Sequence, residues 1–341
     1  MLATRFTELV GCAMPIQQAG MGAAAPPELA AAVSQAGALG MLGTARPGLT
    51  ATTLADLLAT LRSLTDKPFG VNFIVAPIFL NGTSTRPPLD LKCIEIAARA
   101  AKVVEFFYGE PDRRLVEMVH AGGALACWQA GSREEAVAAA RAGCDFVVAQ
   151  GIEAGGHVRG TTPTMTLLSE VIAAVDIPVL AAGGIGTGQA MAAALAAGAD
   201  GVRIGTRFVA AVEAAAHPQY VAALIRAEAQ DTAYTEAFSV GWPDAPHRVL
   251  RSAIASAEAF QGDVIGEWSS LDGTRMPIRR FQVGVADNTT TGTIEAMPLW
   301  AGESVGAVKR VQHAAEIVQE LVEEAERSRS QGERTVVPAS P

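Results

Sequence analysis

The sequence predicts an α/β protein in which a (β/α)8 TIM barrel carries an inserted helical lid segment after its eighth strand. Short apolar runs that suit strands alternate with Ala-rich runs that suit helices, and eight such strands can be counted before residue 210. Most of these runs lack polar alternation, as strands do when helices cover both sheet faces. The length of 341 residues suits one barrel of about 250 residues with an additional segment.

The candidate strands follow one another at intervals that leave room for a helix after each. In order they are Ile16–Ala19, Leu39–Leu42, Gly70–Val75, Val103–Phe107, Ala124–Trp128, Phe146–Ala149, Val179–Ala182 and Val202–Ile204. Before the second, sixth and eighth strands an Ala-rich helix ends at Ala-Gly. Gly37, Gly143 and Gly198 therefore stand where a helix C-terminus favours a left-handed residue. A doubly wound open sheet is the alternative, since periodicity alone does not establish closure.

The pattern changes after Phe208. Residues 211–300 hold two helical stretches, Gln219–Glu228 and Ser252–Phe260, among Gly, Pro and Trp, and no further Ala-Gly junctions. We interpret them as a lid over the substrate, inserted before a final helix at Val305–Ser328. The barrel domain would then comprise residues 1–210 and 301–328. Residues 329–341 are expected to form a disordered tail, because they are polar and contain proline.

Charge and cysteine usage exclude several classes of function. The 26 Lys and Arg against 35 Asp and Glu give a net charge of −9, which repels nucleic acid and anionic lipid and favours a small-molecule substrate. The four cysteines form no C-x-x-C pair and are not combined with histidines at metal-site spacing, so neither disulfides nor a metal is expected. No apolar run reaches the roughly 18 residues of a membrane span, and the N-terminus lacks a signal pattern. We expect a cytoplasmic protein without membrane contact, and a homo-oligomer remains open.

The stretch Gln150-Gly-Ile-Glu-Ala-Gly-Gly-His157 follows the sixth strand directly. In a barrel the active site lies at the C-terminal ends of the strands, so this loop is expected to face the substrate. Gly155 and Gly156 would let the backbone approach a ligand, and His157 can take or give a proton near neutral pH. A surface histidine on a flexible loop is the alternative. The other histidines, His120, His217, His247 and His313, match no motif.

A glycine-rich turn, Ala182-Gly-Gly-Ile-Gly-Thr-Gly188, follows the seventh strand and opens a helix. Backbone N–H groups of such a turn bind anions, and barrels commonly hold a phosphate at the loops after strands seven and eight. Gly205 and Thr206, at the end of the eighth strand, would form the second half of this site. A dinucleotide fingerprint is the competing interpretation. The glycines at 183, 184, 186 and 188 do not follow its G-x-G-x-x-G spacing.

These motifs together resemble those of the nitronate monooxygenase (2-nitropropane dioxygenase) family, and the resemblance covers nearly the whole barrel. Its elements are Pro15-Ile16 leading into Ala19-Gly-Met21, Phe69-Gly-Val-Asn72, Gln150–His157, Ala182-Gly-Gly-Ile185, Gly205-Thr-Arg-Phe208 and Pro298-Leu-Trp-Ala-Gly302. The resemblance implies FMN as the cofactor and His157 as the catalytic residue. By the same matching, the flavin would be bound by Gly20, Met21, Gly22, Asn72, Gln129, Gln150, Gly155 and Gly156, and its phosphate by Gly183, Gly184, Gly205 and Thr206.

Taken alone, Met21 would be a core residue and Asn72 a turn residue. Gln129 and Gln150 are harder to explain without a ligand, because an amide at the end of a buried strand needs hydrogen-bond partners. The function implied is oxidation of alkyl nitronates or nitroalkanes with O2 to a carbonyl compound and nitrite, with His157 as base or substrate-orienting group. Flavin-dependent enoyl-acyl carrier protein reductases and NADH:quinone reductases, which use NAD(P)H, are the enzyme alternatives. A non-catalytic flavin-binding protein is the third.

Overall fold

A computed structural model describes residues 3–75 and 89–335, and its eight-stranded parallel sheet closes into a barrel. The strands are β1 (Ile16–Gln18), β2 (Gly40–Gly43), β3 (Phe69–Ile74), β4 (Val103–Phe107), β5 (Leu125–Ala130), β6 (Phe146–Gln150), β8 (Val179–Ala182) and β9 (Gly201–Ile204). Their order is β1-β9-β8-β6-β5-β4-β3-β2. The two ends meet where Gln18 N–H donates to Leu39 O (2.9 Å) and Leu39 N–H to Ile16 O (2.8 Å). The barrel prediction is confirmed, and the open-sheet alternative is wrong.

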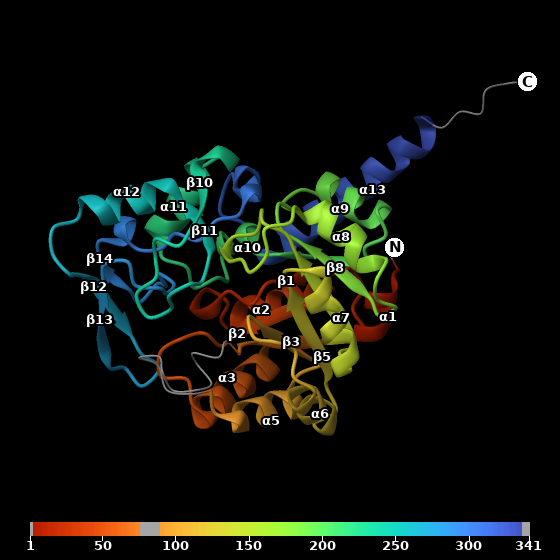
Figure 1. Cartoon of the computed structure of the whole chain (residues 1–341), viewed down its shortest axis with the longest axis horizontal. Coiled ribbons are helices and arrows are strands. Elements are labelled where there is room, and N and C mark those ends of the chain that lie inside the picture. Colours follow the sequence, from red (N-terminus) through yellow and green to blue (C-terminus); the bar gives the residue numbers. More distant parts are fainter. Residues whose placement is uncertain (1–2, 76–88, 336–341) are drawn as a thin grey trace, which may run out of the picture.

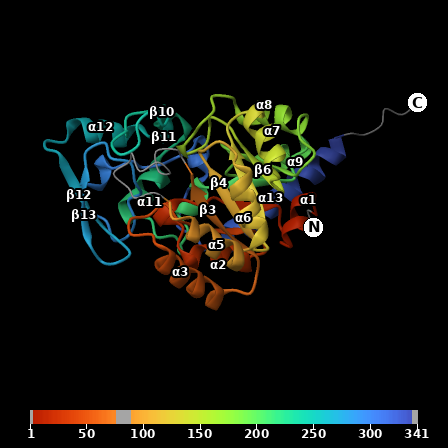
Figure 2. The ribbon, with the colours of Figure 1, turned by 60° about the horizontal axis from the view of Figure 1, so that its bottom comes forward.

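Helices surround the barrel on its outside (Figures 1 and 2). They are α2 (Pro27–Gln35), α3 (Ala51–Leu64), α5 (Leu91–Ala100), α6 (Arg113–Ala121), α7 (Arg133–Ala142), α8 (Thr164–Ile172), α9 (Gly188–Ala196) and α13 (Ala314–Thr335). The predicted Ala-Gly junctions have the expected geometry, because Gly37, Gly143 and Gly198 have φ angles of 89°, 101° and 101°. α13 packs against α9 and α2 and so supplies the last helix of the ring.

The barrel interior is apolar at one end only. Helix α1 (Arg5–Val10) lies across the N-terminal ends of the strands, and its Phe6 is fully buried with its ring centroid 5.4 Å from that of Phe146. Phe6 and Val10 belong to a cluster with buried strand residues such as Met41 and Leu180. Since apolar side chains fill this end of the barrel, the opposite end, where the strands terminate, is the one at which polar groups can meet a ligand.

Residues 211–300, called the cap segment below, form a separate layer beside the barrel, on the left in Figure 1. The segment contains α11 (Pro218–Arg226), α12 (Arg251–Ala259) and five strands: β10 (Thr232–Thr235), β11 (His247–Leu250), β12 (Val264–Ser269), β13 (Arg275–Arg279) and β14 (Thr291–Gly292). The expectation of a helical lid was therefore wrong in part. The strands are short. Most of them pair with one another, as β10 does with β11 and β12 with β13, but β11 also pairs with β7 (Gly156–His157) of the barrel loop.

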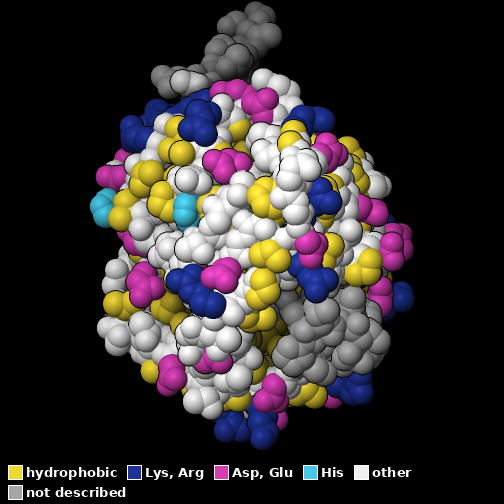
Figure 3. Space-filling view, turned by 90° about the vertical axis from the view of Figure 1, so that its left-hand side faces the viewer, with side chains coloured by type: hydrophobic (Ala, Val, Ile, Leu, Met, Phe, Trp, Pro, Cys, Tyr) yellow, Lys and Arg dark blue, Asp and Glu magenta, His cyan; other side chains and the backbone are white. Residues whose placement is uncertain are grey.

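The outer face of the cap segment carries charges of both signs. Figure 3 shows Lys and Arg side chains interspersed with Asp and Glu on this face. A continuous basic surface, which nucleic acid would require, is not formed there. Within the described residues, no helix is long and apolar enough to cross a membrane.

The final helix differs from its predicted bounds at both ends. It begins at Ala314 rather than Val305, because Glu303–Ala307 forms a separate 3-10 helix that hydrogen-bonds outside α13. Glu303 N–H donates to Glu153 O (2.9 Å), which ties this stretch to the loop after β6. The helix continues to Thr335, so the expectation of disorder from residue 329 is wrong as far as 335. The rest of the predicted tail lies outside the described residues.

Candidate active site

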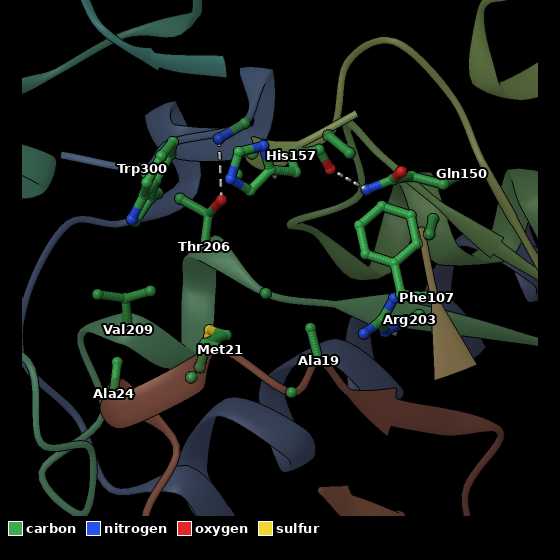
Figure 4. A pocket seen from close by; sticks show the side chains of 18 of the residues that line it. Ala19, Met21, Ala24, Phe107, Gln150, His157, Arg203, Thr206, Val209 and Trp300 are labelled. Carbon is green, nitrogen blue, oxygen red and sulfur yellow. Dashed lines mark hydrogen bonds between the residues drawn. The ribbon is translucent and has the colours of Figure 1, made fainter. Parts of the chain in front are cut away.

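A pocket opens at the C-terminal ends of the barrel strands, between the barrel and the cap segment (Figure 4). Every residue predicted for catalysis or cofactor binding lines it: Gly20, Met21, Gly22, Asn72, Gln129, Gln150, Gly155, Gly156, His157, Gly183, Gly184, Gly205 and Thr206. The cap segment adds mostly apolar and aromatic side chains, among them Tyr220, Trp242, Val283, Val285 and Trp300. The structure thus brings the predicted residues together, while their individual roles remain predictions.

One wall of the pocket consists of backbone from two neighbouring loops. Gly183 and Gly184 follow β8 with φ angles of 110° and 69°, a left-handed conformation that L side chains rarely adopt. Gly205 and Thr206 follow β9, which is paired with β8. Thr206 Oγ1 accepts a hydrogen bond from Gly302 N–H at 3.0 Å (Figure 4), so its own hydroxyl hydrogen can still donate. Such a wall of close backbone and a hydroxyl donor suits an anionic group.

His157 stands among aromatic rings of the pocket. Its ring centroid lies 4.0 Å from that of Trp242 and 5.3 Å from that of Trp300. Its two-residue strand β7 pairs with β11 of the cap segment, with His157 opposite His247. Gln150 of β6 supports the same loop, because its Nε2 donates to His157 O at 3.1 Å (Figure 4). The imidazole is therefore placed by the barrel and the cap segment together.

His247, which matched no sequence motif, is fully buried beside His157, with ring centroids 5.5 Å apart. Its Nδ1 lies 2.9 Å from Ala245 O, and its Nε2 accepts from Phe238 N–H at 3.3 Å. Burial lowers the pKa of His247 below its ordinary 6.5. The ring is therefore neutral at pH 7 and places no second cation beside His157. Since this juxtaposition depends on the β7–β11 pairing, local sequence contained no signal for it.

A family model described as nitronate monooxygenase matches residues 3–324 of the chain. The chain belongs to the nitronate monooxygenase family. It is accordingly an oxidoreductase with a flavin cofactor, as the resemblance predicted.

Individual members and structural neighbours agree with this membership. The nitronate monooxygenase of Pseudomonas aeruginosa is 33% identical over 95% of this chain and 99% of its own length. The (3aS,4S,5R,7aS)-5-hydroxy-7a-methyl-1-oxo-octahydro-1H-indene-4-carboxyl-CoA dehydrogenase of Rhodococcus jostii is 36% identical over 78% of this chain and 70% of its own.

Two solved structures superpose on nearly the whole chain. FabK from Thermotoga maritima has a TM-score of 0.78 and 29% identity, covering 98% of this chain and 100% of its own. Nitroalkane oxidase from Streptomyces ansochromogenes has a TM-score of 0.75 and 30% identity, with coverages of 96% and 99%.

The pocket of this nitronate monooxygenase family member contains unsatisfied hydrogen-bonding groups that a flavin could satisfy. Gln129 Oε1, Gln150 Oε1 and Arg203 Nε are buried without a hydrogen-bond partner in the described part of the chain, and all three residues line the pocket. Leaving a buried polar group unpaired costs about 1–3 kcal/mol. A flavin ring presents both carbonyl oxygens and an N–H, so donors and acceptors of this kind fit it. Among the described residues no cluster of His, Cys, Asp or Glu could hold a metal ion.

Sequence reasoning missed two further groups at the site. Tyr108, directly after β4, has a φ of 82° and its ring centroid is 5.8 Å from that of His157. Burial raises the pKa of its hydroxyl to about 12, so it stays protonated. Arg203 lines the pocket and pairs with the buried Glu105. Arg203 and Glu105 each interrupt an otherwise apolar strand. A charged residue in such a strand could have indicated from the sequence that it has a functional partner.

Proposed function

We propose that the protein oxidises alkyl nitronates with O2, using FMN held in this pocket. In the balanced reaction two nitronates and one O2 give two carbonyl compounds and two nitrite ions. The observation that carries the proposal is that one pocket combines a backbone anion cradle, the Gln129 and Gln150 amide oxygens, which have no partner among the described residues, and a histidine among aromatic rings. The nitronate monooxygenase of Pseudomonas aeruginosa, similar over nearly its full length, supports the same activity.

FMN rather than FAD is proposed because the anion cradle would hold a terminal phosphate. Gly183, Gly184, Gly205 and Thr206 would bind that phosphate, and Asn72, Gln129 and Gln150 the ring and ribityl chain. When bound, the flavin supplies the electron transfer, and the protein contributes positioning and electrostatics. Heat release followed by mass measurement tests the proposal: FMN is expected, and FAD or no flavin after reconstitution would contradict it.

His157 would act on the substrate. A nitronate is already an anion, so the imidazole would orient it and stabilise its charge; with a neutral nitroalkane it would remove the α-proton. Trp242 and Trp300, whose rings flank His157, would exclude water from the substrate.

His157→Asn tests this role. It should keep FMN bound but lower turnover of a neutral nitroalkane by about 10² to 10⁴, with a smaller loss on preformed nitronate. His120→Asn is the matched control, because His120 lies outside the pocket and pairs with Asp145. Equal activity of His157→Asn and wild type on both substrates would make His157 a bystander.

An NAD(P)H-dependent reductase is the second candidate. The likeness to FabK and the similarity to the Rhodococcus jostii dehydrogenase favour it. Anaerobic mixing of the flavin-loaded protein with a nitronate or with NAD(P)H separates the two, since only the true donor bleaches the flavin absorbance. Bleaching by neither would indicate a flavin-binding protein without this catalysis.

The cap segment would serve as the lid, because it provides Trp242, Val283 and Trp300 to the pocket. A cytoplasmic location is proposed on the cysteines: Cys12, Cys93, Cys127 and Cys144 are all free, as is usual in a reducing compartment.

A further inference from the structure

A buried polar cluster lies under the floor of the pocket. Four barrel strands contribute one side chain each: Gln17 from β1, Asn72 from β3, Glu105 from β4 and Arg203 from β9. Glu105 is at its centre and has no solvent exposure. Its Oε1 accepts from Asn72 Nδ2 and from Arg203 Nη2, both at 2.7 Å, and its Oε2 accepts from Gln17 Nε2 at 2.9 Å. Asn72 and Arg203 line the pocket, whereas Glu105 and Gln17 do not.

Glu105 determines which atoms of Asn72 and Arg203 remain free to bind a ligand in the pocket. Because Asn72 donates its amide hydrogen to the carboxylate, its Oδ1 is left as the atom that can accept from a ligand. Gly20 leaves room for the Asn72 side chain, since a Cβ at Gly20 would lie 2.3 Å from Asn72 Cβ. The Arg203 guanidinium forms its ion pair with Glu105 through Nη2, and its buried Nε has no partner in the described residues.

We infer that Glu105 is a positioning residue that orients Asn72 and Arg203 toward the flavin ring and offsets the charge of Arg203 there. The inference rests on the proposed binding of the flavin in this pocket. A fully reduced flavin carries a negative charge on its ring near neutral pH, and the oxidised ring does not. Arg203, at the pocket surface, stabilises that charge, and Glu105, one layer deeper, opposes it. The pair therefore sets the reduction potential of the bound flavin, with Arg203 raising it and Glu105 limiting the rise.

Glu105→Gln tests this charge balance. The amide has the same shape and keeps an acceptor oxygen, but it leaves the charge of Arg203 without compensation. Reduced flavin should then bind at least tenfold more tightly relative to oxidised flavin than in the wild type. For a two-electron couple that ratio equals an upward shift of about 30 mV in midpoint potential. The measurement is a spectroscopic redox titration of the flavin-loaded protein, which requires no turnover.

Asp200→Asn is the matched control. Asp200 is also a buried carboxylate, paired with Arg5 at 2.7 Å. It precedes β9 at the opposite end of the barrel from the pocket. Its replacement removes one buried negative charge without changing the pocket floor, so the flavin potential should stay at the wild-type value. An equal shift in Asp200→Asn and Glu105→Gln, or no shift in Glu105→Gln, would overturn the inference.

If the single variant fails to fold or to hold flavin, the double variant Glu105→Gln, Arg203→Gln tests whether this ion pair affects the flavin potential. It leaves no unpaired charge in the barrel, and its potential should fall below that of the wild type because the cation is gone. A potential equal to that of the wild type would mean that the pair is only structural. Failure of the proposed flavin binding looks different, since the wild-type protein itself would then hold no flavin in this pocket. A change of electron donor from a nitronate to NAD(P)H would leave the redox titration and its expected shifts unaffected.

Discussion

Gly156 immediately precedes His157, and its replacement by alanine tests how strictly the backbone of this loop is constrained. Gly156 has a φ of 76°, and a Cβ added there would meet no heavy atom within 4 Å. The cost of Gly156→Ala is therefore conformational alone, about 1–2 kcal/mol for an L residue in the left-handed region. Gly155→Ala is the comparison. Its Cβ would lie 2.4 Å from Gly302 N and 2.7 Å from Ala301 C, so backbone would have to move.

Equilibrium unfolding in urea measures both changes, with tryptophan fluorescence as the signal, because the rings of Trp242 and Trp300 lie 4.0 Å and 5.3 Å from that of His157. Gly156→Ala should lower the unfolding free energy by about 1–2 kcal/mol. Gly155→Ala should lower it by about 3 kcal/mol or more, the upper range for overpacking. An unchanged unfolding free energy in Gly156→Ala, or a loss as large as that in Gly155→Ala, would contradict this prediction.

Three further changes have defined outcomes. Gly184→Val should weaken flavin binding about tenfold or more, because Gly184 has a φ of 69° and its Cβ would lie 3.3 Å from Glu153 Cβ; fluorescence titration with FMN measures the affinity, and wild-type affinity would place the phosphate elsewhere. Burial lowers the folded pKa of His247, so stability should fall as pH drops below its unfolded value near 6.5; His247→Gln should flatten this acid-side decline, and an unchanged slope would contradict the prediction. The exposed His313 ring donates a hydrogen bond to the Glu213 carboxylate, which raises the pKa of His313. Its contribution to stability is therefore complete below pH 6.5 and is lost as pH rises through the raised folded value; in unfolding measured from pH 6 to 8, His313→Gln should lack this loss.

Continuous apolar runs made the barrel predictable. Val179–Ala182 and Phe146–Ala149 can be buried on both faces only if helices cover a parallel sheet, and the structure places both in one. Gly183, Gly184 and His157 could be assigned to one pocket because loops after neighbouring barrel strands share one rim. The local sequence pattern was therefore enough to predict the barrel strands and the loops that follow them.

Prediction failed where the structure depends on residues distant in sequence. Strand β11 of the cap segment pairs with the distant β7, and β13 is exposed at four of its five residues, so no continuous apolar run marked these strands. Glu105 and Arg203 were passed over because each lies inside an apolar strand, where a charge has to be explained by a partner on another strand. Tyr108 and Trp242 meet across the boundary between barrel and cap segment, at a ring distance of 4.6 Å, which no single stretch encodes.

Because α13 lies at the C-terminal end of the chain, the barrel is synthesised before the helix that completes its outer ring. The last barrel strand, β9, ends at Ile204, but the helix that packs on α9 and α2 begins only at Ala314. At about 5–20 residues per second, synthesis of the intervening chain takes roughly 5 to 20 seconds. During that interval the nascent barrel exposes the apolar surface that Ile317 and Leu321 of α13 later bury. Premature termination before α13 would therefore release an aggregation-prone barrel with exposed apolar surface. A chaperone would be most useful during this interval.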